Sequence, residues 1–197
     1  MTGQLVEPVG AGRPLRVRKK EATRAALHEA AFRLVAENGL AAVTVEMICA
    51  AADVSPRTFF NYYPTKASAV FDMVPAVISP KQQEDFLSSQ GDLLEDTVAF
   101  TAENIQLPTD VARLKELLQR HEGLSSEFWK LIRDQLIPLI ALLEKRCDGA
   151  HEAWVIFGLV FAATNAAVRT PSAARSEDIR ARLLAEISAM RALLDSR

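Results

Sequence analysis

The sequence predicts an all-α fold in which a small N-terminal three-helix headpiece precedes a larger helical bundle. Its 197 residues are 49% apolar and include only eight glycines, a composition that favours helices and supplies enough apolar side chain for a buried core. Apolar residues recur at helical spacing along most of the chain. No segment alternates apolar and polar residues between turn signals, so a sheet is not expected.

Residues 1–20 are expected to form a flexible basic arm, because glycines, prolines and cations occupy this stretch without apolar periodicity. Residues 1–70 carry nine Lys and Arg against six Asp and Glu, a net charge of +3. The remaining residues carry fourteen against nineteen, a net charge of −5. The N-terminal end of the chain therefore favours an anionic partner.

Residues 21–66 are predicted to hold three helices. The first has an apolar stripe at helical spacing, formed by Leu27, Ala31, Leu34 and Val35. This helix should end at Asn38-Gly39, because glycine readily adopts the left-handed conformation that follows a helix C-terminus.

Two further helices are expected close behind. Thr44 is a suitable N-cap for a short second helix, and Ser55-Pro56 supplies the cap and the first residue of a third. Pro64 disfavours helical geometry at the preceding residue, so the third helix must be short. Three helices within about 40 residues, with a tight turn between the last two, indicate a helix-turn-helix.

The third helix presents a face suited to the major groove of DNA. The side chains predicted to pack inward are Phe59, Phe60 and Tyr63. The side chains predicted to project outward are Arg57, Thr58, Asn61 and Tyr62. Arginine can bond two acceptors of guanine, asparagine can pair with adenine, and a threonine methyl can contact a thymine methyl.

Phosphate contacts are expected from three neighbouring positions. Tyr62 can donate its hydroxyl to a phosphate oxygen. Thr44 and Lys66 stand at helix starts, where a hydroxyl, free backbone amides and a positive charge favour an anion.

A longer set of residues at fixed spacing connects these features to a known family. It comprises Thr23-Arg24, Ala30-Ala31, Gly39, Thr44, Ile48, Val54-Ser55 and the run Phe59-Phe60-Asn61-Tyr62-Tyr63-Pro64-Thr65-Lys66. In these residues the stretch 23–71 resembles the DNA-binding domain of the TetR (tetracycline-repressor) family of transcriptional regulators. The resemblance implies base reading by Arg57, Thr58 and Asn61, and phosphate contacts by Thr44, Tyr62 and Lys66. With the cap residue included, the predicted DNA-binding set is Thr44, Ser55, Arg57, Thr58, Asn61, Tyr62 and Lys66.

Two positions depart from the usual pattern of the family. Asp53 stands in the turn where the family usually has glycine, and Cys49 stands where it often has alanine. Aspartate visits the left-handed conformation more readily than most residues, although its charge is unfavourable near DNA. Cys49 is interpreted as a small buried residue, with redox sensing as the less favoured alternative.

The resemblance implies that residues 67–197 form a helical domain for ligand binding and dimerisation. The sequence independently contains an apolar seam at helical spacing, formed by Ile179, Leu183, Ile187, Met190 and Leu194. Small residues on the preceding helix would allow close helix approach, among them Ala162 and Ala166. We predict that these residues form a homodimer interface, and the alternative is that they fill an intramolecular core.

An effector pocket is predicted inside the bundle, where three segments bring aromatic and apolar residues together with one amide. Its candidate residues are Phe100, Asn104, Phe128, Trp129, Ile132, Trp154, Phe157 and Phe161. Their apolar character favours a hydrophobic or amphipathic small molecule. The alternative is that they are ordinary core residues.

Other functional classes find little support in the sequence. It has no Gly-rich phosphate loop after a strand and no Gly-x-Ser-x-Gly elbow, so an enzyme is not expected. No cofactor, metal site, secretory signal or membrane segment is expected, and two cysteines without metal spacing favour a reducing cytoplasmic location.

The predicted function is that of a ligand-responsive regulator, most simply a repressor, that binds a palindromic operator in double-stranded DNA as a homodimer. The alternative is a dimeric helical interaction or lipid-binding protein without specific DNA binding.

Overall fold

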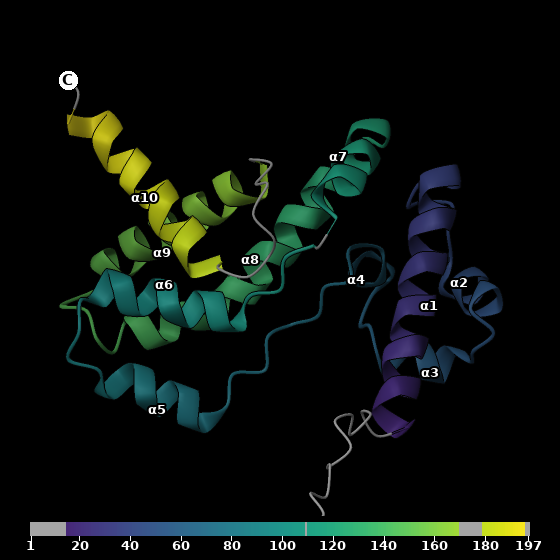
Figure 1. The fold of residues 1–197 in the computed structure, drawn as a ribbon, viewed down its shortest axis with the longest axis horizontal. Coiled ribbons are helices and arrows are strands. Elements are labelled where there is room, and N and C mark those ends of the chain that lie inside the picture. The colour runs from purple at the N-terminus through teal and green to yellow at the C-terminus, as the bar shows by residue number, and fades with distance from the viewer. Residues whose placement is uncertain (1–14, 109, 170–178, 196–197) are drawn as a thin grey trace, which may run out of the picture.

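The structure, a computed structural model, describes residues 15–108, 110–169 and 179–195 (Figure 1). Its N-terminal helices are α1 (Leu15–Asn38), α2 (Val45–Ala51), α3 (Pro56–Phe60) and α4 (Lys66–Phe71). Helix α1 packs against α2 and α4, and α2 packs against α3. The predicted three-helix headpiece is therefore confirmed.

The helix starts in the headpiece follow the predicted capping residues. The Thr44 side chain accepts a hydrogen bond from the Met47 N–H, and the Ser55 side chain accepts one from the Thr58 N–H. Helix α1 ends before Gly39, whose φ of 76° lies in the left-handed region. Local capping chemistry thus sets these boundaries.

The arm prediction is wrong for residues 15–20. These residues form the first turns of α1, and all of them are exposed. Their Arg, Lys and Leu side chains are good helix formers, so the helix extends beyond its packed part without needing a buried face. Residues 1–14 of the predicted arm lie outside the described residues.

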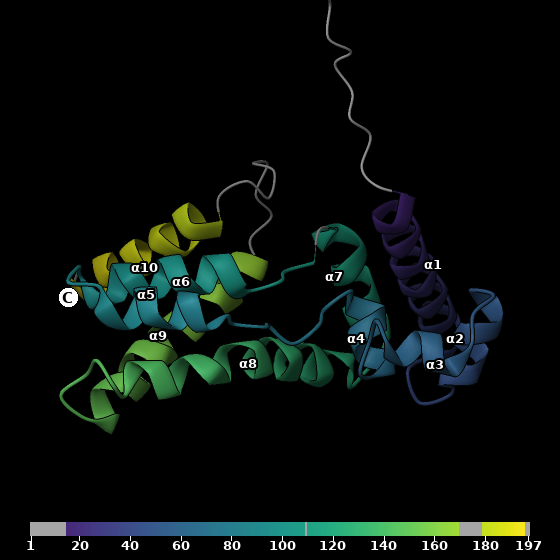
Figure 2. The ribbon, with the colours of Figure 1, turned by 90° about the horizontal axis from the view of Figure 1, so that it is seen from below.

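The bundle comprises the helices that follow α4. They are α5 (Pro80–Ser88), α6 (Leu93–Asn104), α7 (Val111–Arg120), α8 (Leu124–Leu143), α9 (Ala150–Arg169) and α10 (Ile179–Asp195). Helix α10 packs on α6 and α9, and α8 runs from the bundle to α4 (Figure 2). The described ranges contain helices and no strands, which confirms the all-α prediction.

Helix α8 contains Pro138 in its interior and continues through it as one helix. Helix α9 is long and apolar enough to cross a membrane by length and composition, but seven of its residues are buried within the chain. It packs against α6, α8 and α10.

The predicted dimer seam is wrong at its centre. Leu183 and Ile187 are 0% and 2% exposed and pack inside the chain with Val98 of α6 and Val160 of α9. Ile179 and Met190 are half-buried against the same cluster. The stripe on α10 faces the groove between α6 and α9, so the alternative of an intramolecular core holds for it.

Two residues of the predicted interface are exposed on α9 and α10. Leu194 is 79% exposed and Ala162 is exposed, whereas Ala166 is half-buried. The dimer prediction can therefore still apply to Ala162 and Leu194.

Candidate nucleic-acid interface

Helix α3 carries the predicted base-reading face. Arg57 and Asn61 are both exposed and lie four residues apart, so they share one side of this helix. Thr58 is half-buried, and its hydroxyl lies 2.9 Å from the Ser55 hydroxyl. Ser55 is therefore committed to capping the helix, and Thr58 offers its methyl group more readily than its hydroxyl.

Phe60 differs from its prediction as an inward residue, because its side chain is 57% exposed. Phe59 and Tyr63 occupy the inward side of the helix and are both fully buried. Phe60 lies one position, about 100°, further round, which brings it beside Asn61. Phe60 is therefore an exposed neighbour of the predicted base-reading residues. Sequence periodicity missed it because two adjacent phenylalanines look equally suited to the core.

The turn between α2 and α3 contains the predicted left-handed aspartate. Asp53 has a φ of 53°, and the N–H of the next residue, Val54, donates to the Cys49 carbonyl at 3.0 Å. Cys49 is buried, and burial raises the pKa of its thiol. A protonated, buried thiol agrees with the packing role predicted for Cys49.

We expect Asp53→Gly to raise the free energy of unfolding by about 0.5–1 kcal/mol, since glycine adopts this φ without a Cβ clash. Asp53→Asn is the matched control, because it removes the negative charge and keeps a side chain that tolerates the conformation. Both variants should bind DNA more tightly, but only the glycine should shift the chemical denaturation midpoint. Equal denaturation midpoints for the two variants would show that the positive φ of Asp53 does not cost stability.

The Lys66 side chain forms two hydrogen bonds within the headpiece that the sequence did not predict. Its Nζ donates to the Leu40 carbonyl at 2.6 Å and to the Val43 carbonyl at 2.9 Å. The ammonium group thereby links the start of α4 to the connection between α1 and α2. Most of its hydrogen-bonding capacity is directed inward, whereas the prediction directed it to phosphate.

We expect Lys66→Met to lower the free energy of unfolding by about 1.5–3 kcal/mol, because two carbonyls lose a charged donor. Lys115→Met, at an exposed position on α7, is the matched control and should leave stability unchanged. Chemical denaturation measures both variants. If Lys66→Met leaves stability unchanged and weakens binding to all DNA sequences equally, the predicted phosphate contact of Lys66 would be supported instead.

The remaining predicted phosphate contacts keep accessible groups. Thr44 is exposed, and its oxygen accepts the capping bond from Met47, which leaves its hydroxyl proton free to donate. Tyr62 is half-buried against the headpiece core. Thr44 at the start of α2 and Tyr62 after α3 therefore flank the reading helix.

The headpiece and the bundle meet where α1 faces α7. Arg113 forms two hydrogen bonds of 2.7 Å with the Glu29 carboxylate and lies over the Phe32 ring. Its hydrogen bonds hold the pKa of Glu29 below the usual value. The His121 ring also bonds the Ala36 carbonyl at 3.0 Å, near the end of α1.

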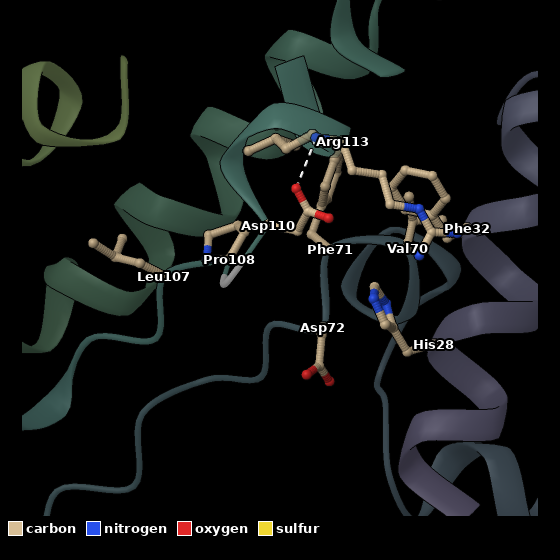
Figure 3. A pocket seen from close by; sticks show the side chains of 10 residues that line it. His28, Phe32, Val70, Phe71, Asp72, Leu107, Pro108, Asp110 and Arg113 are labelled. Carbon is tan, nitrogen blue, oxygen red and sulfur yellow. Dashed lines mark hydrogen bonds between the residues drawn. The ribbon is translucent and has the colours of Figure 1, made fainter. Parts of the chain in front are cut away.

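A small hollow lies beside this contact (Figure 3). His28 and Phe32 of α1 and Arg113 of α7 face it, together with the loop that holds Leu107 and Pro108. Its volume is about 60 Å³. A drug-sized ligand needs roughly 300 Å³ or more, so this hollow is too small for one.

None of the eight predicted effector residues lines that hollow. Phe128 and Ile132 are fully buried in the core, Phe100 packs on Phe86, and Asn104 bonds Gln82. On α9 the rings of Trp154, Phe157 and Phe161 form successive pairs, and Trp154 is 54% exposed. Trp129 lies between the Phe128 ring and the Arg169 guanidinium. The structure places these residues on three helices of the bundle, α6, α8 and α9.

Metal and redox chemistry have no assembled site in the part of the chain that the structure describes. No group of three or more His, Cys, Asp or Glu residues there is placed to hold a metal ion. Cys147 is half-buried, and burial raises the pKa of its thiol.

Comparison with known proteins finds a family-model match in the N-terminal helices. Residues 27–71 match the family model of bacterial regulatory proteins of the tetR family. No curated protein matches the chain. Among solved structures, NalD, the secondary repressor of the MexAB-OprM multidrug efflux pump in Pseudomonas aeruginosa, is 21% identical, with 87% of this chain and 96% of that chain covered and a TM-score of 0.47. Salmonella enterica GusR is 19% identical, with 94% and 98% covered and a TM-score of 0.38.

The family match coincides with the helices that position Arg57, Phe60 and Asn61. It also includes the Thr44 and Ser55 caps and Lys66. The N-terminal helices of this chain, over residues 27–71, therefore match the model of the tetR family of bacterial regulatory proteins and contain a helix-turn-helix.

Proposed function

We propose that this protein is a ligand-responsive repressor that binds a palindromic operator as a homodimer in the cytoplasm. The observation that carries the proposal is the exposed face of α3, where Arg57, Phe60 and Asn61 project from a helix capped by Ser55. An exposed arginine, aromatic ring and amide are the groups that read base edges in a major groove. A buried core role accounts for none of these three side chains.

Specific DNA binding and binding to an anionic surface predict different salt and mutation effects. A labelled genomic fragment pool and vesicles containing anionic lipid serve as probes at several salt concentrations. We expect tight, salt-dependent DNA binding that weakens in Arg57→Ala, and vesicle binding that is weak in both proteins. Tight vesicle binding that ignores Arg57→Ala would favour the alternative of a lipid-binding helical protein.

Dimerisation is proposed to use the outer faces of α9 and α10. Trp154 and Val155 on α9 are 54% and 55% exposed, and Leu193 and Leu194 on α10 are 71% and 79% exposed. Exposed apolar side chains on two helices that pack on each other are typical of a protein interface. Two copies are needed because one headpiece contacts too few phosphates, whereas paired headpieces read two half-sites.

The effector is proposed to be a hydrophobic or amphipathic small molecule. Support comes from the aromatic side chains of α6, α8 and α9 and from the polar neighbour Asn104. Binding in the bundle must favour one separation of the headpieces over another in order to change operator affinity. Titration of operator binding with apolar and cationic amphipathic compounds tests this, and a bound compound that leaves operator affinity unchanged would exclude it as the effector.

A further inference from the structure

A chain of polar side chains runs from the bundle to the end of the reading helix. On the bundle side, Gln135 of α8 is 6% exposed and bonds the backbone of Gln106 twice. Its Oε1 accepts from the Gln106 N–H at 2.7 Å, and its Nε2 donates to the Gln106 carbonyl at 3.2 Å. Gln135 therefore fixes the loop after α6 to α8.

The Gln106 side chain carries the connection into the headpiece. Its Oε1 accepts hydrogen bonds from Arg24 Nη2 of α1 at 3.4 Å and from the Val74 N–H at 3.3 Å. One amide oxygen thus joins the bundle loop, the first helix and the segment that leaves α4.

Arg24 continues the chain to Asp72 and Tyr63. Its Nε donates to Asp72 Oδ1 at 2.8 Å, and its Nη2 donates to the Asp72 carbonyl at 3.1 Å. The Tyr63 hydroxyl donates to the same Asp72 carboxylate oxygen. Burial, together with the neighbouring Asp72 charge, raises the pKa of Tyr63 above its usual range, so the hydroxyl stays a donor.

Asp72 sits in a conformation that its surroundings must maintain. Its φ of 52° lies in the left-handed region, where it ends α4. A non-glycine residue keeps such a conformation when neighbouring contacts determine it. The hydrogen bonds from Arg24 and Tyr63 to Asp72 provide these contacts. The direction in which the chain leaves α4 therefore depends on Tyr63, which follows the reading helix.

We propose that Gln106 is the positioning residue through which the bundle sets the orientation of the DNA-reading helices. This inference rests on the proposed function and adds the route by which the bundle acts on it. The neighbouring Glu29–Arg113 pair is partly solvent-exposed, at 56% and 38%, and such pairs contribute little. Gln106 instead joins α1 and the exit from α4 through its side chain, and it is held to α8 through its backbone.

Two variants of Gln106 separate its acceptor function from its size. Gln106→Met keeps the length of the side chain and removes both accepted bonds, whereas Gln106→Glu keeps an acceptor for Arg24 and Val74. Gln82→Met is the matched control, because the Gln82 side chain bonds Ser79 and Asn104 within the bundle. In Gln106→Met the headpiece should no longer be held in one orientation relative to the bundle, whereas Gln82→Met should leave this orientation unchanged.

The readout is affinity for a full operator compared with affinity for DNA that carries one half-site. A released headpiece must be ordered again only when both half-sites are bound together. We expect Gln106→Met to lose about fivefold in affinity for the full operator, with the half-site within about twofold of wild type. Gln106→Glu and Gln82→Met should match wild type on both. Equal losses on both DNAs, or no loss, would overturn the positioning role.

Hydrogen exchange gives a readout that needs no DNA. The Asp72 and Met73 N–H groups bond Ala69 and Ser68 carbonyls at the end of α4. Their exchange should accelerate in Gln106→Met and stay unchanged in Gln82→Met. If exchange is unchanged in both variants, the positioning role of Gln106 is overturned, even if the protein binds an operator. If exchange accelerates in Gln106→Met but the wild-type protein binds no operator, only the proposed function is contradicted.

Discussion

Replacing both Arg57 and Asn61 with alanine is expected to remove discrimination between operator and random DNA. Each bidentate contact from such side chains contributes about 1–3 kcal/mol of base discrimination, so the pair should change the specificity ratio by roughly 30-fold or more. Both side chains are exposed on the same side of α3, and neither is needed to fill the headpiece core. Fluorescence anisotropy with operator and scrambled DNA measures the ratio.

The matched control removes a cation from the bundle instead. Arg120→Ala eliminates an exposed arginine on α7 whose partner is Glu116. It should leave the operator-to-random ratio unchanged, and circular dichroism should show that all variants remain folded. Equal losses on operator and random DNA in the double variant would mean that Arg57 and Asn61 contact phosphates and do not read bases.

Leu183→Ala is expected to lower the free energy of unfolding by about 2–5 kcal/mol, the range for removing a fully buried leucine from a packed core. Leu183 is 0% exposed between α6 and α9. Leu194→Ala on the same helix removes a side chain that is 79% exposed. Its cost to the monomer should stay within about 0.5 kcal/mol.

Leu194→Ala should instead weaken self-association. Denaturation of both variants at several protein concentrations separates the two effects, because a dimer contribution depends on concentration and a core contribution does not. Analytical ultracentrifugation then compares their dimer dissociation constants. The assignment of Leu183 to the core and Leu194 to the dimer surface would be contradicted by either of two results. One is a large loss of stability in Leu194→Ala that does not depend on concentration, and the other is a small loss of stability in Leu183→Ala.

Local sequence signals predicted the headpiece well because its boundaries depend on local chemistry. Thr44 and Ser55 cap the helices that they were expected to cap, and Asp53 adopts the positive φ expected from its place in the turn. Each of these effects involves residues within three positions of one another. Residue type and spacing therefore suffice to predict them.

Effects that depend on distant partners could not be read from spacing. Lys66 is committed to carbonyls 23 and 26 residues earlier, and Gln106 accepts from an arginine 82 residues earlier. The apolar periodicity of α10 predicts a contact surface, but it does not reveal whether the facing groove belongs to the same chain. The seven aromatic and apolar effector candidates have the same ambiguity, since a core and a pocket share one composition.

Selection of bound fragments from a genomic DNA pool at near-physiological salt tests the central claim most directly. The wild-type protein is compared with the Arg57→Ala, Asn61→Ala double variant. The account predicts that the wild type alone recovers a palindromic motif, with half-sites spaced by about 34–36 Å or a multiple of it. Recovery of no motif, or of the same DNA by both proteins, would contradict sequence-specific recognition by α3.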